Sequence, residues 1–97
     1  MAITVLYELP TMTQEQYDNI IKLLQDRGLT AEGRTFHVAG PRQEGGWQVV
    51  DVFESPAAFD TFVQQKLGGI IQEVGAEPPQ ITVCPVHNLL TGTDHHL

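Results

Sequence analysis

The sequence predicts an α+β protein whose strands and helices follow the order β-α-β-β-α-β. Three observations support this order: four short runs of β-branched and apolar residues, two segments with helical periodicity, and turn residues at the junctions. The order is that of the split βαβ, or ferredoxin-like, arrangement, a four-stranded antiparallel sheet with two helices on one face. Right-handed crossovers place the first and third strands side by side in the centre.

The first strand and the first helix have clear boundaries. Residues 3–9, ITVLYEL, are apolar and β-branched, and a proline follows them. Thr13 then begins a capping box with Gln16. Four side chains repeat at the spacing of one helical face: Tyr17, Ile20, Ile21 and Leu24. Because Gly28 is a natural C-terminal stop, we expect a helix over residues 14–27.

A hairpin follows the first helix. RTFHVAG, residues 34–40, and WQVVDVFE, residues 47–54, predict two strands, and the turn residues PRQEGG join them. Ser55 and Pro56 then mark the start of the second helix, with serine as N-cap and proline at the first helical position.

The second helix and the last strand each contain an irregular feature. The adjacent glycines Gly68 and Gly69 weaken the helix and predict a kink or a break there. The last strand is expected over residues 80–90, and Pro85 within it indicates an edge position or a bulge. Cys84 lies in the apolar run ITVCPV and is expected to be a buried small hydrophobe.

Length and charge exclude several classes of function. The 97 residues suit one domain, expected over residues 1–90 with a flexible tail over residues 91–97. The net charge is −7 and the five basic residues are scattered, so we expect binding neither to nucleic acid nor to anionic membranes. Because the N-terminus resembles no signal peptide and no segment is long enough to span a bilayer, we expect a cytoplasmic protein.

Alternation along the hairpin separates its residues into two faces. If Phe36 and Val38 pair with Val50 and Val52, one face is aliphatic and suited to the helices. The opposite face then holds Thr35, His37, Ala39, Trp47, Val49, Asp51 and Phe53. His37 and Asp51 are cross-strand neighbours in this register, whereas a shift by one residue separates them. The side of the sheet without helices is also apolar and needs a cover.

The face with His37 and Asp51 has the composition of a small-molecule site. Trp47 and Phe53 supply apolar walls, and the two polar groups lie between them. A carboxylate beside an imidazole fixes its tautomer and raises its basicity, which general-base catalysis requires. The alternative is a His–Asp pair that only satisfies its own polar groups within the sheet.

Other candidates have a structural and a functional interpretation each. Tyr7 is either a cavity hydroxyl or an ordinary half-buried strand residue, and Tyr17 is most simply core with its hydroxyl at the rim. His87 either reaches the cavity mouth or hydrogen-bonds at a strand end. We expect no metal site, because His95-His96 lies on a frayed tail and nothing in the spacing of His37, His87 and Asp51 demands a metal-binding triad.

The segments EQYD, FHVAGP, GWQVVDVFES, AFDTF and PVHNLL resemble small bacterial proteins of the dimeric α/β-barrel superfamily, of the antibiotic-biosynthesis-monooxygenase type. The resemblance spans about residues 3–90. It implies a homodimer through the open sheet face, with helices outside and a cavity between the two sheets. That cavity would hold His37, Trp47, Asp51 and Phe53. Characterised members include cofactor-independent oxygenases of polyphenolic polyketides, haem-degrading enzymes and proteins with no assigned catalysis.

Two hypotheses follow from the residues and the resemblance together. In the first, the protein is a monooxygenase-like enzyme that needs no cofactor and acts on a small aromatic or polyketide-like compound. His37 would be its base, Asp51 would orient His37, and Trp47, Phe53, Tyr7 and His87 would contact the substrate. In the second, the protein is a non-catalytic dimeric module that binds a small ligand or a partner protein.

Overall fold

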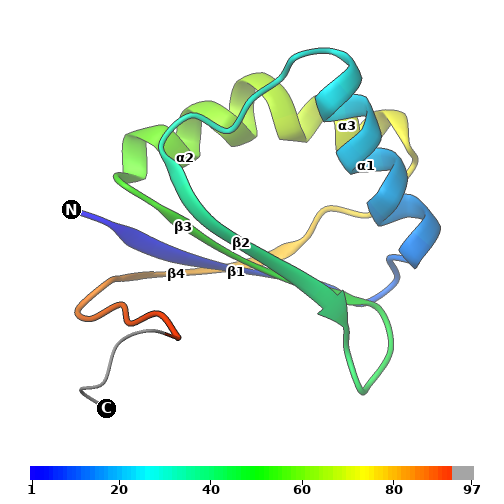
Figure 1. The fold of residues 1–97 in the computed structure, drawn as a ribbon. Coiled ribbons are helices and arrows are strands. Elements are labelled where there is room, and N and C mark those ends of the chain that lie inside the picture. The colour runs from blue at the N-terminus through cyan, green and yellow to red at the C-terminus, as the bar shows by residue number, and fades with distance from the viewer. Residues whose placement is uncertain (93–97) are drawn as a thin grey trace.

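The computed structural model describes residues 1–92 and has the predicted ferredoxin-like order (Figure 1). Its elements are β1 (Ile3–Leu9), α1 (Gln14–Asp26), β2 (Arg34–Pro41), β3 (Trp47–Phe53), α2 (Pro56–Phe62), the π-helical turn η1 (Val63–Leu67), α3 (Gly68–Glu73) and β4 (Gln80–Pro85). The sheet has the antiparallel order β2-β3-β1-β4, so the first and third strands are central, as predicted. Residues 93–97 of the tail predicted over residues 91–97, with His95 and His96, lie outside the described residues.

The helix starts follow the capping chemistry of the sequence. The Thr13 hydroxyl accepts a hydrogen bond from the Gln16 N–H at 3.1 Å, and the Gln16 side chain accepts one from the Thr13 N–H at 3.1 Å. The Ser55 hydroxyl accepts one from the Ala58 N–H at 3.1 Å. These bonds satisfy N–H groups that lack partners within the helix, so both starts are set by local sequence.

The predicted break near the two glycines takes the form of the π-helical turn between α2 and α3. The Gly68 N–H donates to the Val63 carbonyl, and a Cβ at Gly68 would lie 2.9 Å from that oxygen. A residue without a side chain therefore accommodates the wider turn. Such turns occur frequently at functional sites. Here Phe62 before the turn and Leu67 at its end line the same cavity.

The last strand is shorter than predicted. It ends at Pro85 instead of Leu90, and it is an edge strand, as the proline indicated. The Val86 N–H still donates to the Ala2 carbonyl at 3.0 Å, and no further helix or strand follows in residues 86–92.

The assignment of the two sheet faces from the hairpin alone is wrong. His37 lies opposite Asp51, as predicted, but Asp51 also lies opposite Val5 of β1, which is fully buried. Phe53 on the same side packs 5.6 Å from Phe59 and 5.9 Å from Phe62 of α2 between ring centroids. The His37–Asp51 side therefore faces the helices. The cause is β1, in which four buried side chains turn to the helices: Ile3, Val5, Tyr7 and Leu9.

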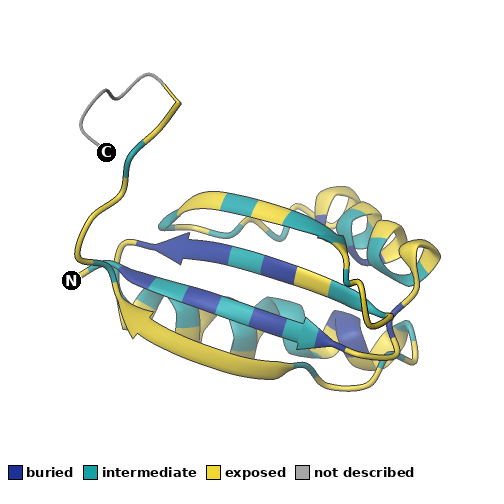
Figure 2. Ribbon diagram, turned by 90° about the horizontal axis from the view of Figure 1, so that it is seen from below, coloured by how far each residue is buried: buried dark blue, intermediate teal, exposed yellow. Residues whose placement is uncertain are grey.

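The opposite side, here called the open face, carries the aliphatic residues that the hairpin pattern assigned to the core. Cross-strand pairing places these residues on it: Phe36, Val38, Val50, Val52, Thr4, Leu6, Thr82 and Cys84. Figure 2, seen from below, shows this face with the helices behind the sheet. Phe36 is 49% and Val38 is 50% exposed. Cys84 is exposed and not buried as expected, because it lies on an edge strand of an uncovered face.

Candidate functional site

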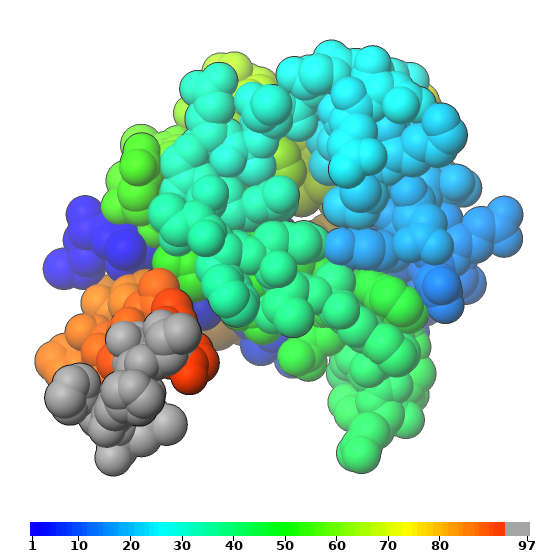
Figure 3. Space-filling model, viewed as in Figure 1, coloured from blue at the N-terminus to red at the C-terminus, as the bar shows by residue number. Residues whose placement is uncertain are grey.

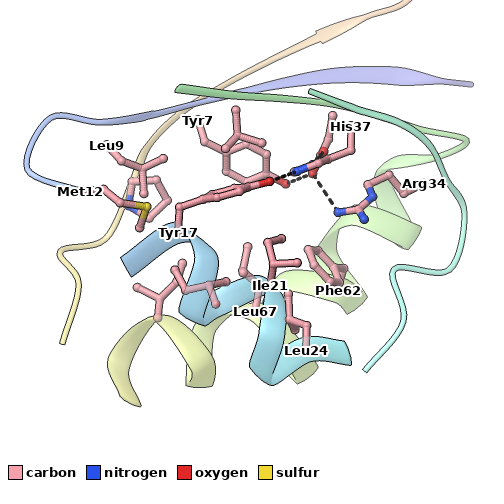
Figure 4. A pocket seen from close by; sticks show the side chains of 15 residues that line it. Tyr7, Leu9, Met12, Tyr17, Ile21, Leu24, Arg34, His37, Phe62 and Leu67 are labelled. Carbon is pink, nitrogen blue, oxygen red and sulfur yellow. Dashed lines mark hydrogen bonds and ion pairs between the residues drawn. The ribbon is translucent and has the colours of Figure 1, made fainter. Parts of the chain in front are cut away.

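Four side chains from four elements form one hydrogen-bonded chain on the helix side of the sheet (Figure 4). The Tyr7 hydroxyl donates to Asp51 Oδ2 at 2.8 Å. His37 Nδ1 lies 2.5 Å from Asp51 Oδ1, and His37 Nε2 lies 2.7 Å from the Tyr17 hydroxyl. The sheet thus supplies three members of the chain and α1 supplies the fourth.

The pattern of hydrogen bonds assigns the tautomer of His37. An Asp51 carboxylate only accepts hydrogen bonds, so Nδ1 of His37 carries a proton and donates to it. In the neutral ring Nε2 then has the lone pair and accepts from the Tyr17 hydroxyl. This is the arrangement of a general base oriented by a carboxylate.

Asp51 is the most deeply buried polar residue of the site, with 2% of its surface exposed. Burying a carboxylate is unfavourable unless hydrogen bonds and opposite charge compensate for lost water. Tyr7 and His37 supply the hydrogen bonds, and Arg34 Nη1 lies 3.8 Å from Asp51 Oδ2. The polar chain is therefore a unit whose members depend on one another.

Both tyrosines of the chain hold their protons firmly. Burial raises the pKa of Tyr7 well above its ordinary value, and the negative charge and hydrogen bond of Asp51 raise it further. Burial also raises the pKa of Tyr17, although the positive charge of Arg34 opposes this shift. Near neutral pH both phenols therefore keep their protons and act as hydrogen-bond donors, Tyr7 to Asp51 and Tyr17 to the His37 ring.

An apolar cavity of about 50 Å³ lies between the sheet and the helices, beside the polar chain. It is lined by Tyr7, Leu9, Met12, Tyr17, Ile20, Ile21, Leu24, Arg34, His37, Val49, Asp51, Phe62, Leu67, Ile71 and Pro79. The resemblance implied that His37 and Asp51 line a cavity between the sheets of two subunits, and this placement of the two residues is wrong because both face the helices. The volume admits a few water molecules, so an aromatic ligand also needs the space outside.

The other predicted site residues lie in three different settings. Tyr7 joins the polar chain directly. Trp47 packs 5.5 Å from the Tyr17 ring, and its buried Nε1 has no hydrogen-bond partner in the described part of the chain. Phe53 is fully buried among the α2 phenylalanines, and exposed His87 follows β4. Neither Trp47, Phe53 nor His87 lines the cavity, and a ligand contact for them stays a prediction.

The sequence analysis missed Tyr17 and Arg34 as members of the site. Tyr17 shares a helical face with Ile20 and Ile21, so its direction toward the sheet was available from the spacing. Arg34 had no such signal. The register of β2 shifts between Arg34 and Phe36, and this irregularity allows Arg34 and His37, three residues apart, to line one cavity.

Residues 1–92 contain neither a candidate metal site nor a helix that could span a membrane. No group of three or more His, Cys, Asp or Glu side chains in this range is placed to hold a metal ion. Within the same range, no helix has the length and apolar character needed to cross a bilayer.

No protein-family model and no curated protein matches the sequence. Solved structures do match. A dimeric ferredoxin-like protein of unknown function from Thermobifida fusca has a TM-score of 0.64 at 11% identity, covering 89% of this chain and 92% of its own. A candidate antibiotic biosynthesis monooxygenase from Bordetella bronchiseptica has a TM-score of 0.61 at 20% identity, with coverages of 92% and 98%.

A mutant of SnoaB, a cofactor-independent oxygenase from Streptomyces nogalater, has a TM-score of 0.61 at 8% identity, with coverages of 92% and 94%. Dimeric ferredoxin-like proteins, several of unknown function, and monooxygenase-like proteins are thus the structural neighbours of this chain. At these identities the likeness shows a shared fold.

Proposed function

We propose that the protein is a cofactor-independent, monooxygenase-like enzyme in which His37 removes a proton from a small phenolic or polyketide-like substrate. One observation carries the proposal: His37 lines an apolar cavity, Asp51 lies 2.5 Å from its Nδ1 and orients the ring, and its Nε2 meets only the Tyr17 hydroxyl, which a substrate hydroxyl can replace. A base held in this way, beside a site with few polar groups, suits proton abstraction from a weakly acidic aromatic compound.

The proton transfer uses each member of the polar chain. The acidic hydrogen of the substrate displaces the Tyr17 hydroxyl from His37 Nε2 and passes to that nitrogen. The resulting imidazolium is stabilised by the buried negative charge of Asp51. Tyr7 occupies the second carboxylate oxygen and keeps its own proton, so Asp51 stays oriented toward His37.

The oxidation that follows balances without an external reductant. The substrate anion transfers one electron to dioxygen, and the radical pair combines to a peroxide anion. This anion takes the proton back from the His37 imidazolium and becomes a hydroperoxide, which regenerates the base. Loss of water then leaves a carbonyl, so a CH₂ group and O₂ become a C=O group and H₂O. All four electrons come from the substrate, and the protein contributes the base and the apolar surroundings.

The second candidate function is a non-catalytic module that binds a small ligand. Two observations favour it. The polar groups of the site form hydrogen bonds with one another, and the cavity volume is too small for an aromatic ring. In that case His37 and Asp51 hold β2, β3 and α1 together and no proton leaves a ligand.

Oxygen uptake with 1,8-dihydroxyanthrone, a tricyclic phenol with an activated CH₂, tests the two candidates. We expect catalysed uptake in the wild type and a loss of at least about 100-fold in His37→Ala, since a general base contributes roughly that much. Gln43→Ala, an exposed turn residue, is the control and is expected to keep full activity. Circular dichroism checks the fold of both variants. Undiminished uptake in His37→Ala would remove His37 from the mechanism, whereas saturable binding without uptake in the wild type would favour the module.

We also propose that the open face pairs with the open face of a second copy. Phe36 and Val38 leave apolar surface half exposed there, and a second copy would remove it from water. The dimeric neighbours with the same fold support this arrangement. It keeps the helix side, and with it His37, accessible in each copy.

A further inference from the structure

A surface groove of about 430 Å³ adjoins the cavity that contains His37. It lies between α1, the loop that follows α1 and the start of β2, and Figure 3 shows the surface hollowed between α1 and β2. The groove and the cavity share four lining residues: Ile21, Leu24, Arg34 and Phe62. Its size falls in the range of roughly 300–1,000 Å³ that small-molecule sites occupy. The groove therefore supplies the room for aromatic rings that the cavity lacks.

Arg34 lies at the junction of groove and cavity with its hydrogen-bonding capacity unused. Its Nη1 is 3.8 Å from Asp51 Oδ2, too far for a good hydrogen bond, and its Cζ lies 5.7 Å from the centroid of the Phe62 ring. In residues 1–92 its side chain makes no hydrogen bond. Arg27 and Arg42 differ, because both donate to glutamate carboxylates. The Arg34 side chain is 26% exposed, so a ligand can reach it.

The walls of the groove bring no carboxylate of their own to Arg34. Among its described lining residues Arg34 is the only charged one, and the rest are apolar or neutral, such as Leu29, Ala31 and Gln25. Arg34 thus presents its positive charge to an apolar groove, and its ion-pair partner Asp51, 3.8 Å away, lies on the cavity side. A guanidinium has five N–H donors in a planar fork that matches the two oxygens of a carboxylate. A neutral ligand would form weaker hydrogen bonds with this fork and would not pair with its charge.

We propose that the groove binds an aromatic compound that carries a carboxylate, with Arg34 holding the acid group and the apolar walls holding the rings. The proposal adds a substrate class to the proposed function. It rests on that function for the claim that the bound compound reacts, whereas binding itself can be tested alone. Because Arg34 lines both the groove and the cavity, an acid group on Arg34 holds the ligand where the groove meets the cavity that contains His37.

Binding of 2-naphthoate and of the neutral 2-naphthamide to the full-length protein tests the proposal. The two probes have the same rings and differ in charge. We expect the naphthoate to bind at least about 10-fold more tightly to the wild type, in line with hydrogen bonds to a charged group. In Arg34→Met the two affinities should become equal within about two-fold. Arg42→Met, which removes a turn arginine outside the groove, is the control and should keep the preference.

Arg34→Lys keeps the proposal testable if Arg34→Met does not fold. It keeps a positive charge near Asp51 but loses the planar fork, and we expect a reduced yet measurable preference for naphthoate. Equal binding of both probes to the wild type, or a preference that survives in Arg34→Met, would overturn the proposal. Oxygen uptake is scored separately. A naphthoate preference without any oxygen uptake contradicts the proposed oxygenase and supports the ligand class. Oxygen uptake with equal binding of the two probes supports the oxygenase and contradicts the ligand class.

Discussion

The helix side of the sheet buries a carboxylate, whereas the open face leaves large apolar side chains half exposed. Asp51 is 2% exposed on the first, and Phe36 and Val38 are 49% and 50% exposed on the second. Folding alone favours the opposite distribution, because charge prefers water and apolar surface prefers the interior. The difference indicates that each face serves something outside the folded chain. This difference is the basis of our two proposals, ligand chemistry on the helix side and self-association on the open face.

Removing the buried carboxylate is expected to have the largest effect. Asp51→Ala deprives Tyr7 and His37 of their acceptor and leaves Arg34 without its nearest negative charge. We expect the free energy of unfolding to fall by about 3 kcal/mol, measured by urea denaturation. Asp18→Ala, at an exposed position on α1, is the matched control and should change it by less than about 0.5 kcal/mol. Similar values for both variants would mean that the polar chain adds nothing to stability.

Two valine-to-lysine substitutions, one on each side of the sheet, test whether the open face forms the dimer interface. Val38 and Val83 are 50% and 47% exposed, but Val38 lies on the open face and Val83 pairs with Val5 on the helix side. We expect Val38→Lys to raise the dimer dissociation constant at least about 10-fold, because the charge enters the interface twice. Val83→Lys should leave it unchanged. Sedimentation velocity measures both, and a monomeric wild type or equal effects would contradict the assignment.

The smallest expected effect concerns the Tyr7 proton at alkaline pH. Burial raises the pKa of Tyr7 above the ordinary value of 10.0, so the folded protein binds this proton more tightly than the unfolded chain. Its contribution to stability is complete below pH 10 and is lost as pH rises toward the folded pKa. Above pH 10 the unfolding free energy should fall, and in Tyr7→Phe its slope should be shallower by up to about 1.4 kcal/mol per pH unit. Urea denaturation between about pH 9 and 11.5 measures the slopes. Identical slopes in the two proteins would show that folding does not raise the pKa of Tyr7.

Local signals were sufficient to predict the fold and the pairing of His37 with Asp51. Caps, turn residues and alternation act over a few neighbouring residues, and they placed the strands and helices within a few residues, apart from the end of β4. The hairpin register followed from the segregation of aliphatic and mixed residues, and it is the observed one at His37 and Asp51.

Which face of the hairpin turns inward depends on a contact between distant segments. Alternation separates two sets of side chains, but it does not say which set lies beside Val5 and Tyr7 of β1. The aliphatic set looked like core because Val38 and its neighbours are apolar enough for an interior. The mixed set is tolerated inside because Tyr7 and His37 satisfy Asp51. Arg34 escaped notice because the register shift after it breaks the alternation.

A nuclear magnetic resonance titration of the protein with 2-naphthoate tests most directly whether the helix side is the working face. We expect saturable shifts of the His37 ring signals and of the Ile21 and Leu24 methyl signals, which belong to residues that line the cavity. The methyl signals of Val38 and Val50 on the open face should not move. Saturable shifts at Val38 and Val50 with unchanged His37 signals would place the ligand on the open face and contradict the account.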